Sequence, residues 1–187
     1  MGKQNLSLLV RFLLRSEEII MTRLVPKDNP GPIFKRLFKT PIFFYRIGLP
    51  IFRGFVLLLT TTGRKSGKQR YTPLEYQREK STGYPIIMAG WGGKTDWKHN
   101  IVANPHVHVQ IGHESFNATA EPLNDAETIA RLTEAMKINP NSAKIWSRWA
   151  GEIVTLEDPG SIERSVKYFP CFRLKPIIDN GAGNQSA

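Results

Sequence analysis

Apolar and polar residues follow two different periods along this chain, and the period changes near Phe55. Before that point, apolar side chains recur at helical spacing over residues 6–13, with charged residues along another stripe. A second helical pattern runs from about Ile33 to Ile47 and ends before Pro50. These segments predict a helical N-terminal extension, residues 1–54, ahead of a main domain at 55–176.

The segment after Phe55 is typical of short strands with a few inserted helices. Strands are predicted at 56–62, at 70–76, from Tyr84, at 106–111 and at 115–123. The first two form a hairpin, and the last two form an antiparallel pair that turns near Gly112. Strands in such close order favour an α+β class with a barrel-like antiparallel sheet over a doubly wound nucleotide fold.

Two helices are predicted within this strand-rich part. The first begins near Thr95 and is stopped by Pro105. The second follows Asn124, which is an N-cap residue with Glu127 three positions later, the arrangement of a capping box. The tail, residues 177–187, is small and polar and is expected to be disordered.

Composition restricts the class of protein. The 187 residues are 41% hydrophobic and carry a formal net charge of +10, which fits one folded domain. The only cysteine, Cys171, permits no internal disulfide and favours a cytoplasmic protein. No run of residues is long and apolar enough to cross a membrane.

The charge excess is concentrated at the N-terminus, where residues 1–55 hold ten Lys and Arg against three acidic residues. This asymmetry suggests an anionic lipid surface or nucleic acid as partner. Residues 1–25 form an amphipathic helix that either contacts anionic membrane as a peripheral anchor, on the cytoplasmic face, or packs on the protein itself. The sequence leaves both alternatives open, and it leaves the oligomeric state open too.

The hairpin between 56–62 and 70–76 has an unusually basic tip, "GRKSGK". Arg64, Lys65, Lys68 and Arg70 surround two glycines and Ser66. Only three residues separate Gly63 from Gly67, and Gln69 follows Lys68, so the spacing is not that of a nucleotide-binding P-loop. Charged donors and exposed backbone N–H groups predict an anion site, and a solvated turn explains the same residues equally well.

A second glycine-rich stretch, "AGWGGKTDWKHN", precedes the helix near Thr95. Trp97, His99 and Asn100 stand at the start of that helix, where ligands are often bound. The alternative is that the tryptophans are core residues and His99 lies on the surface. No set of residues has the spacing of a metal site: His106 and His108 share one strand face, and Cys171 is expected to be buried in a strand.

Two strings, "LLLTTTGRKSGKQRYTPL" and "DWKHNIVANPHVHVQIG", carry a family resemblance in their order and separation. Together they resemble the deazaflavin-dependent nitroreductase family, also called deazaflavin- or flavin-dependent oxidoreductases, over about residues 42–140. The resemblance implies a split β-barrel that binds coenzyme F420, an 8-hydroxy-5-deazaflavin with a phosphate and an acidic oligoglutamate tail. It also implies hydride transfer from the reduced deazaflavin C5 to a quinone, nitroaromatic or activated alkene.

The resemblance assigns candidate cofactor-binding residues as well. The phosphate and first carboxylates are expected at the hairpin tip, on Arg64, Lys65, Ser66, Gly67 and Arg70. The ring is expected beside Thr72, Pro73, Leu74, Met88, Ala89, Gly90 and Trp91, and the pocket is closed by Trp97, His99 and Asn100.

The chain departs from the family pattern at two places. Gly90 stands where members often carry a serine, and Trp146 and Trp149 replace a tyrosine-rich substrate lid. No catalytic residue is assigned.

Other functions remain as alternatives. A related split barrel could bind FMN or another flavin-like ligand. A nucleic-acid-binding module is less favoured, because the basic cluster sits on a tip without interleaved aromatic residues.

Overall fold

The computed structural model of the chain describes residues 36, 39–47, 54 and 56–177. The predicted helix at 6–13, the proposed membrane contact of residues 1–25 and nearly all of the tail lie outside this part, so they stay predictions. Of the helical pattern predicted at 33–47, the structure describes α3, Thr40–Arg46. Its buried Tyr45 donates its hydroxyl hydrogen to the Val56 carbonyl at 2.7 Å.

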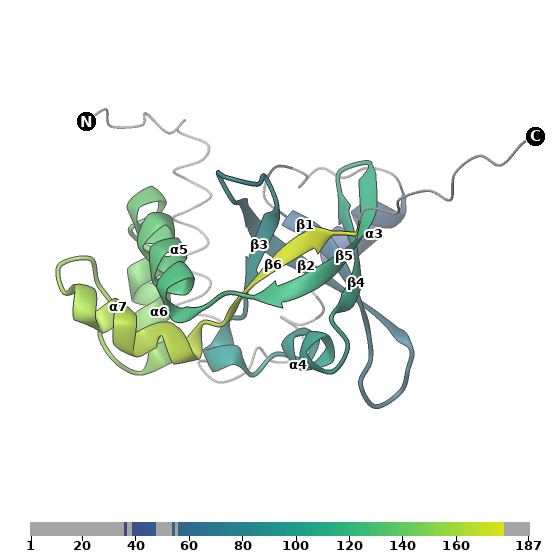
Figure 1. Cartoon of the computed structure of the whole chain (residues 1–187). Coiled ribbons are helices and arrows are strands. Elements are labelled where there is room, and N and C mark those ends of the chain that lie inside the picture. The colour runs from purple at the N-terminus through teal and green to yellow at the C-terminus, as the bar shows by residue number, and fades with distance from the viewer. Residues whose placement is uncertain (1–35, 37–38, 48–53, 55, 178–187) are drawn as a thin grey trace, which may run out of the picture.

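Six antiparallel strands close into a barrel in the order β1-β2-β3-β6-β5-β4 (Figure 1). They are β1 (Val56–Thr62), β2 (Gln69–Arg78), β3 (Pro85–Met88), β4 (His106–Ile111), β5 (Glu114–Pro122) and β6 (Cys171–Pro176). The predicted hairpin is confirmed, with Thr62 opposite Gln69, and so is the β4–β5 pair, which turns at Gly112 with φ +63°. The sixth strand, β6, begins at Cys171, which is buried in a strand as predicted.

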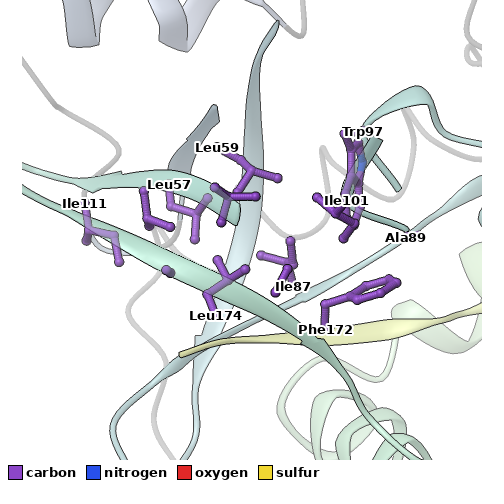
Figure 2. Close-up of a cluster of buried hydrophobic side chains, with 13 residues drawn as sticks. Leu57, Leu59, Ile87, Ala89, Trp97, Ile101, Ile111, Phe172 and Leu174 are labelled. Atoms are coloured by element: carbon purple, nitrogen blue, oxygen red, sulfur yellow. The ribbon is translucent and has the colours of Figure 1, made fainter. Parts of the chain in front are cut away.

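The barrel interior follows from the alternation of side chains along each strand. Leu57 and Leu59 of β1 are fully buried, as is Leu174 of β6, and these side chains point toward one another in Figure 2. Leu57 lies directly opposite Leu74 of β2, which packs against the same core. The core is mainly aliphatic, and its volume is filled by residues from the strands and from one helix.

That helix is α4, Asp96–Ala103, which begins after the N-cap residue Thr95 and ends before Pro105, as predicted. It lies across one end of the barrel (Figure 1) and buries Trp97 and Ile101 in the barrel core. Trp97 meets Phe172 of β6 edge to face, with ring centroids 6.1 Å apart. The helix therefore forms a wall of the barrel core at the end where the β1–β2 hairpin projects.

Three more helices gather beside the barrel, on the left in Figure 1. They are α5 (Asp125–Ile138), α6 (Ser142–Ala150) and α7 (Pro159–Ser165), followed by the short 3-10 helix η3 (Val166–Tyr168). The predicted capping box is confirmed: Glu127 N–H donates to Asn124 Oδ1 and Asn124 N–H donates to Glu127 Oε2, both at 2.9 Å. These helices share a second core of seven buried residues: Leu132, Met136, Ile145, Trp146, Val154, Ile162 and Phe169.

A charged network joins the two parts. The Arg173 guanidinium of β6 donates to both oxygens of Glu79, at 2.9 and 2.6 Å, and to Glu127 Oε1 of α5 at 2.7 Å. Arg173 lowers the pKa of both carboxyl groups, chiefly through these hydrogen bonds. The network thus connects the end of β2, the strand β6 and the first turn of α5.

Among the residues that the structure describes, none of the helices has the length and hydropathy needed to span a membrane. Within the same residues, no three His, Cys, Asp or Glu side chains are grouped to hold a metal ion.

Candidate functional site

The tip of the β1–β2 hairpin is a tight turn over residues 63–68. The Gly63 N–H donates to the Lys68 carbonyl and the Gly67 N–H donates to the Gly63 carbonyl, both at 2.8 Å. Gly67 has φ +64°, a left-handed conformation that costs glycine least. At Gly63 an added Cβ would lie 2.9 Å from Ser66 Oγ, so only glycine fits there without a shift. The backbone of the tip is therefore well defined by its own bonds.

Arg64 fastens this tip to α4. Its guanidinium lies 3.2 Å from Asp96 Oδ1, and it also donates to Asn100 Oδ1 at 3.2 Å. The backbone N–H of Arg64 reaches the same Asn100 oxygen at 3.2 Å. Asn100 is buried and donates through Nδ2 to Thr61 Oγ1 of β1 at 3.1 Å. Arg64 and Asn100, both predicted as cofactor ligands, are thus occupied in joining the hairpin to the helix.

The remaining cations of the tip have no acidic partner among the described residues. Lys65, Lys68 and Arg70 are exposed, and Arg70 Nη2 donates to the Ser66 hydroxyl at 3.3 Å. Arg70 lies directly opposite Thr61, so the two side chains share one face of the sheet at the barrel end that α4 covers. The tip therefore presents three cations at the barrel end that α4 covers, which we call the barrel mouth.

The other residues predicted around the ring are distributed over the barrel. Thr72, Pro73 and Leu74 are half-buried in β2, opposite Leu59, Leu58 and Leu57. Ala89 is fully buried in the barrel core and Met88 packs against the second core. Trp97 is a core residue, as the alternative reading had it, and His99 is exposed on α4.

The backbone is strained just after β3. The 3-10 helix η2, Trp91–Gly93, contains three consecutive positive φ values: +51° at Trp91, +63° at Gly92 and +72° at Gly93. A bulky residue at positive φ costs about 1–3 kcal/mol, and such strain clusters at functional sites. Trp91 is the only non-glycine residue of the described part with this conformation. The turn holds the indole of Trp91 against Trp149 of α6, with ring centroids 5.0 Å apart.

Gly90 makes this contact possible. A Cβ at Gly90 would lie 3.0 Å from Cζ3 and 3.1 Å from Cη2 of Trp149. The departure from the family pattern at Gly90 therefore coincides with the second departure at Trp149. A serine at position 90 would require the Trp149 ring to shift by a few tenths of an ångström.

A cavity of about 450 Å³ opens beside these rings. The described residues that line it come from η2, α6 and η3: Trp91, Gly92, Lys94, Trp149, Ala150, Lys167 and Tyr168. Its size falls in the range of small-molecule sites. Trp146, the other predicted lid residue, is buried in the second core, with its ring 5.6 Å from Phe169, and does not line this cavity.

Sequence reasoning missed three residues of this region: Asp96, Lys94 and Lys167. Asp96 and Lys94 fall within the glycine-rich "GGKTDW" stretch, but no local pattern marks their charges as part of a site. Only Thr95 separates them, so the cavity and the hairpin contact adjoin along the chain. The Thr95 hydroxyl is buried and has no hydrogen-bond partner among the described residues.

A second cavity, of about 370 Å³, contains none of the predicted site residues. Its Lys80 and Arg131 are both paired with Glu134, at 2.7 Å each. Elsewhere, burial raises the pKa of the Cys171 thiol to about 12, so this cysteine stays protonated and is no nucleophile.

Comparison with known sequences places these features in a family. The family described as F420H(2)-dependent quinone reductase has a sequence model that matches residues 45–154, more than half of the chain. The chain belongs to the F420H(2)-dependent quinone reductase family. The resemblance drawn from the two sequence strings is thereby confirmed, and the matched segment includes the basic hairpin, α4, Trp91 and Trp149.

Relatives from Mycobacterium tuberculosis, strains H37Rv and CDC 1551, are named as F420H(2)-dependent quinone reductases. Each is 36% identical to this chain over 97 residues, which are 50% of this chain and 62% of the relative. The match therefore spans less than two thirds of these relatives' length. A solved F420-H2 dependent reductase, FDR-A, is 30% identical and covers 64% of this chain and 93% of its own, with a TM-score of 0.47. Lys167 and Tyr168 lie beyond the part that the quinone reductase family model matches.

Proposed function

We propose that this chain binds reduced coenzyme F420 at the hairpin and barrel mouth and reduces a quinone-type acceptor by hydride transfer. The family assignment supports the reaction class, because the family is named for F420H(2) and quinones. The observation that carries the proposal for this chain is the set of exposed cations at the tip, Lys65, Lys68 and Arg70, which no carboxylate of the described residues neutralises.

The residues fit the chemistry of the cofactor. Its tail is a phosphate followed by carboxylates, and Lys and Arg donate charge-assisted hydrogen bonds to such groups. Thr95, whose buried hydroxyl has no hydrogen-bond partner among the described residues, directly precedes Asp96, which pairs with Arg64 of the tip. The sequence prediction of an anion site at Lys65, Lys68 and Arg70 is retained, with Arg64 moved to a positioning role.

When bound, the reduced deazaflavin supplies a hydride, and a quinone acceptor takes one further proton to become the hydroquinone. The chain's own residues bind and orient. Lys65 and Arg70 hold the anionic tail, and Arg64 with Asn100 fixes the hairpin against α4 so that these cations keep their position relative to the barrel mouth. Half-buried Thr72 and Leu74 of β2 exclude water from the adjoining surface. The acceptor and the proton can be supplied without an assigned catalytic residue.

A cofactor titration tests the proposal. Isothermal titration of the full chain with F420 and, separately, with FMN should give the tighter binding for F420. Changing Lys65 and Arg70 together to alanine should weaken F420 binding by about 10- to 100-fold, the loss of two charge-assisted bonds discounted for their exposure. Replacing Lys137, which is exposed on α5, by alanine is the matched control and should leave F420 affinity unchanged.

Turnover is tested with reduced F420 and three acceptors: a quinone, a nitroaromatic and an activated enone. Deuterium at C5 of the reduced cofactor should produce a primary isotope effect on acceptor reduction. Tighter binding of FMN would favour the flavin alternative. Absence of turnover with all three acceptors would overturn the reductase function even if F420 binds.

A further inference from the structure

The cavity beside Trp91 and Trp149 combines aromatic walls with cations, whereas the hairpin tip presents cations alone. Its walls are aromatic, made by Trp91, Trp149 and Tyr168, and its charged lining residues are both cations, Lys94 and Lys167. No carboxylate lies among the described residues that line it. A flat, electron-poor molecule can stack on such walls, and a negative group on it meets the lysines.

The two lysines are not neutralised by carboxylates of the described residues. Lys94 is exposed and forms no ion pair with any residue that the structure describes. Lys167 is exposed too, and its Nζ stands 5.0 Å from the centre of the Tyr168 ring, a cation–π contact that keeps the ammonium at the cavity wall. Two unneutralised charges therefore face one aromatic space of about 450 Å³.

The cavity is built by long-range packing and strain. Trp91 adopts φ +51° to bring its ring against Trp149, and Gly90 leaves room for that ring by lacking a Cβ. Gly93, at φ +72°, packs where a Cβ would come within 3.2 Å of Pro170. The surrounding packing holds Trp91 in this strained conformation and keeps the aromatic wall in place, as expected of a preformed binding site.

We propose that this cavity binds the acceptor and prefers planar aromatic molecules that carry a negative charge, such as an ionised hydroxyquinone, over their neutral counterparts. This proposal rests on the proposed reductase function for the role of the bound molecule, while the binding preference itself needs no cofactor. Trp91 and Trp149 supply the stacking surface. Lys94 and Lys167 supply the preference for charge.

Two probes of nearly equal shape separate the contributions. 2-Hydroxy-1,4-naphthoquinone is ionised at neutral pH, and 2-methoxy-1,4-naphthoquinone is neutral. Isothermal titration of the full chain without F420 should show the ionised probe binding about fivefold more tightly, the sum of two modest contributions from exposed charges. The preference should shrink as salt is raised from low to high concentration.

The decisive variant replaces Lys94 and Lys167 together by glutamine. We expect the two probes to bind it equally, with the affinity of the neutral probe within about twofold of the wild type, since stacking is retained. A charge-matched control replaces Lys137 and Lys175, which do not line the cavity, and should keep the fivefold preference. Both pairs are exposed, so neither variant is expected to impair folding.

Equal affinity of the two probes for the wild type would overturn the proposal, and so would an equal loss of preference in the control variant. Failure of both probes to bind at millimolar concentration would also overturn it. Turnover with reduced F420 and the neutral probe is measured in parallel. Turnover without the charge preference supports the reductase function and rejects this inference. Preferential binding of the ionised probe without turnover supports the binding preference and rejects the reductase function.

Discussion

The two hydrophobic cores of this protein differ in composition and in what they support. The barrel core is mainly aliphatic, and its fully buried Leu57, Leu59 and Leu174 contact other strand residues. The helical core contains a series of aromatic rings: the ring centroid of Phe169 lies 5.6 Å from that of Trp146 and 6.5 Å from that of Trp149. Trp149 then forms a wall of the cavity. We therefore expect a change in the helical core to affect the candidate acceptor site more than a change in the barrel core.

The strongest test of this difference is Phe169→Ala. Phe169 is fully buried, and removing its ring should lower the free energy of unfolding by about 3–5 kcal/mol. It should also release Trp149 and weaken binding of 2-hydroxy-1,4-naphthoquinone. Denaturant unfolding and isothermal titration measure the two effects.

Leu59→Ala is the matched control in the barrel core and should cost about 2–5 kcal/mol. Its folded form should bind the naphthoquinone as the wild type does. If Leu59→Ala impaired this binding as much as Phe169→Ala, the two cores would not be distinct in function.

A smaller effect is expected from Gly90→Ala, which places a methyl group about 3 Å from the Trp149 ring. An aromatic ring held by its neighbours cannot retreat freely, so we expect a loss of about 1–3 kcal/mol of unfolding free energy and a change in tryptophan emission. Gly54→Ala, where no atom of the described residues lies within 4 Å of the new Cβ, is the control.

Trp149→Phe in the Gly90→Ala background tests the cause. The smaller ring gives the methyl group room, so the second change should cost less in this background than in the wild type. Additive losses would mean that Gly90 is not required by Trp149.

The third prediction concerns the Arg173 network, which joins the barrel to the helical part. Arg173 lowers the pKa of Glu79 and of Glu127 below the ordinary 4.5. A carboxyl group whose pKa is lower in the folded state stabilises the fold above its unfolded-state pKa, and this stability is lost as pH falls through the lowered value. The wild type should therefore lose stability as pH falls below about 4.5.

Arg173→Gln should reduce this acid dependence and lower stability at neutral pH by less than Gly90→Ala does; the part that remains includes Glu134, whose pKa is lowered by Lys80 and Arg131. Unfolding free energies measured from pH 7 to pH 3 check both points. Lys175→Gln on the same strand, whose pair with Glu121 is exposed, should keep the wild-type acid dependence. A wild-type stability that stays flat through this range would contradict the role given to Arg173.

The sequence predicted what local patterns determine. Asn124 and Glu127 stand three residues apart and define their capping box alone, and Gly112 marks its turn because few other residues adopt positive φ. The pair of Arg64 and Asp96 spans 32 residues and exists only because the barrel brings α4 to the hairpin, so no local pattern reveals it.

The same reason explains the two tryptophans of α6. Trp146 and Trp149 are one helical turn apart, and both looked suitable as lid residues. Both rings lie near Phe169, but Trp146 is buried in the second core and Trp149 reaches the cavity wall. Lys167 and Lys94 line the same cavity because η3 contacts η2. Long-range packing selects one residue from a local pattern that fits two.

The smallest effect on stability is expected at the hairpin, in Asp96→Ala. The Asp96 side chain is 90% exposed, so its pair with Arg64 contributes about 0.5 kcal/mol or less to the free energy of unfolding. Asn100 still accepts both hydrogen bonds from Arg64 in this variant, and it holds the tip to β1 through Thr61. Asn100→Ala removes that buried connection and should cost clearly more, about 1–3 kcal/mol, because Thr61 and Arg64 lose their partner together. Denaturant unfolding of both variants measures this order, and F420 titration should show weaker binding for Asn100→Ala than for Asp96→Ala. A loss of about 2 kcal/mol or more in Asp96→Ala would contradict this order, because an exposed ion pair contributes only about 0–1 kcal/mol.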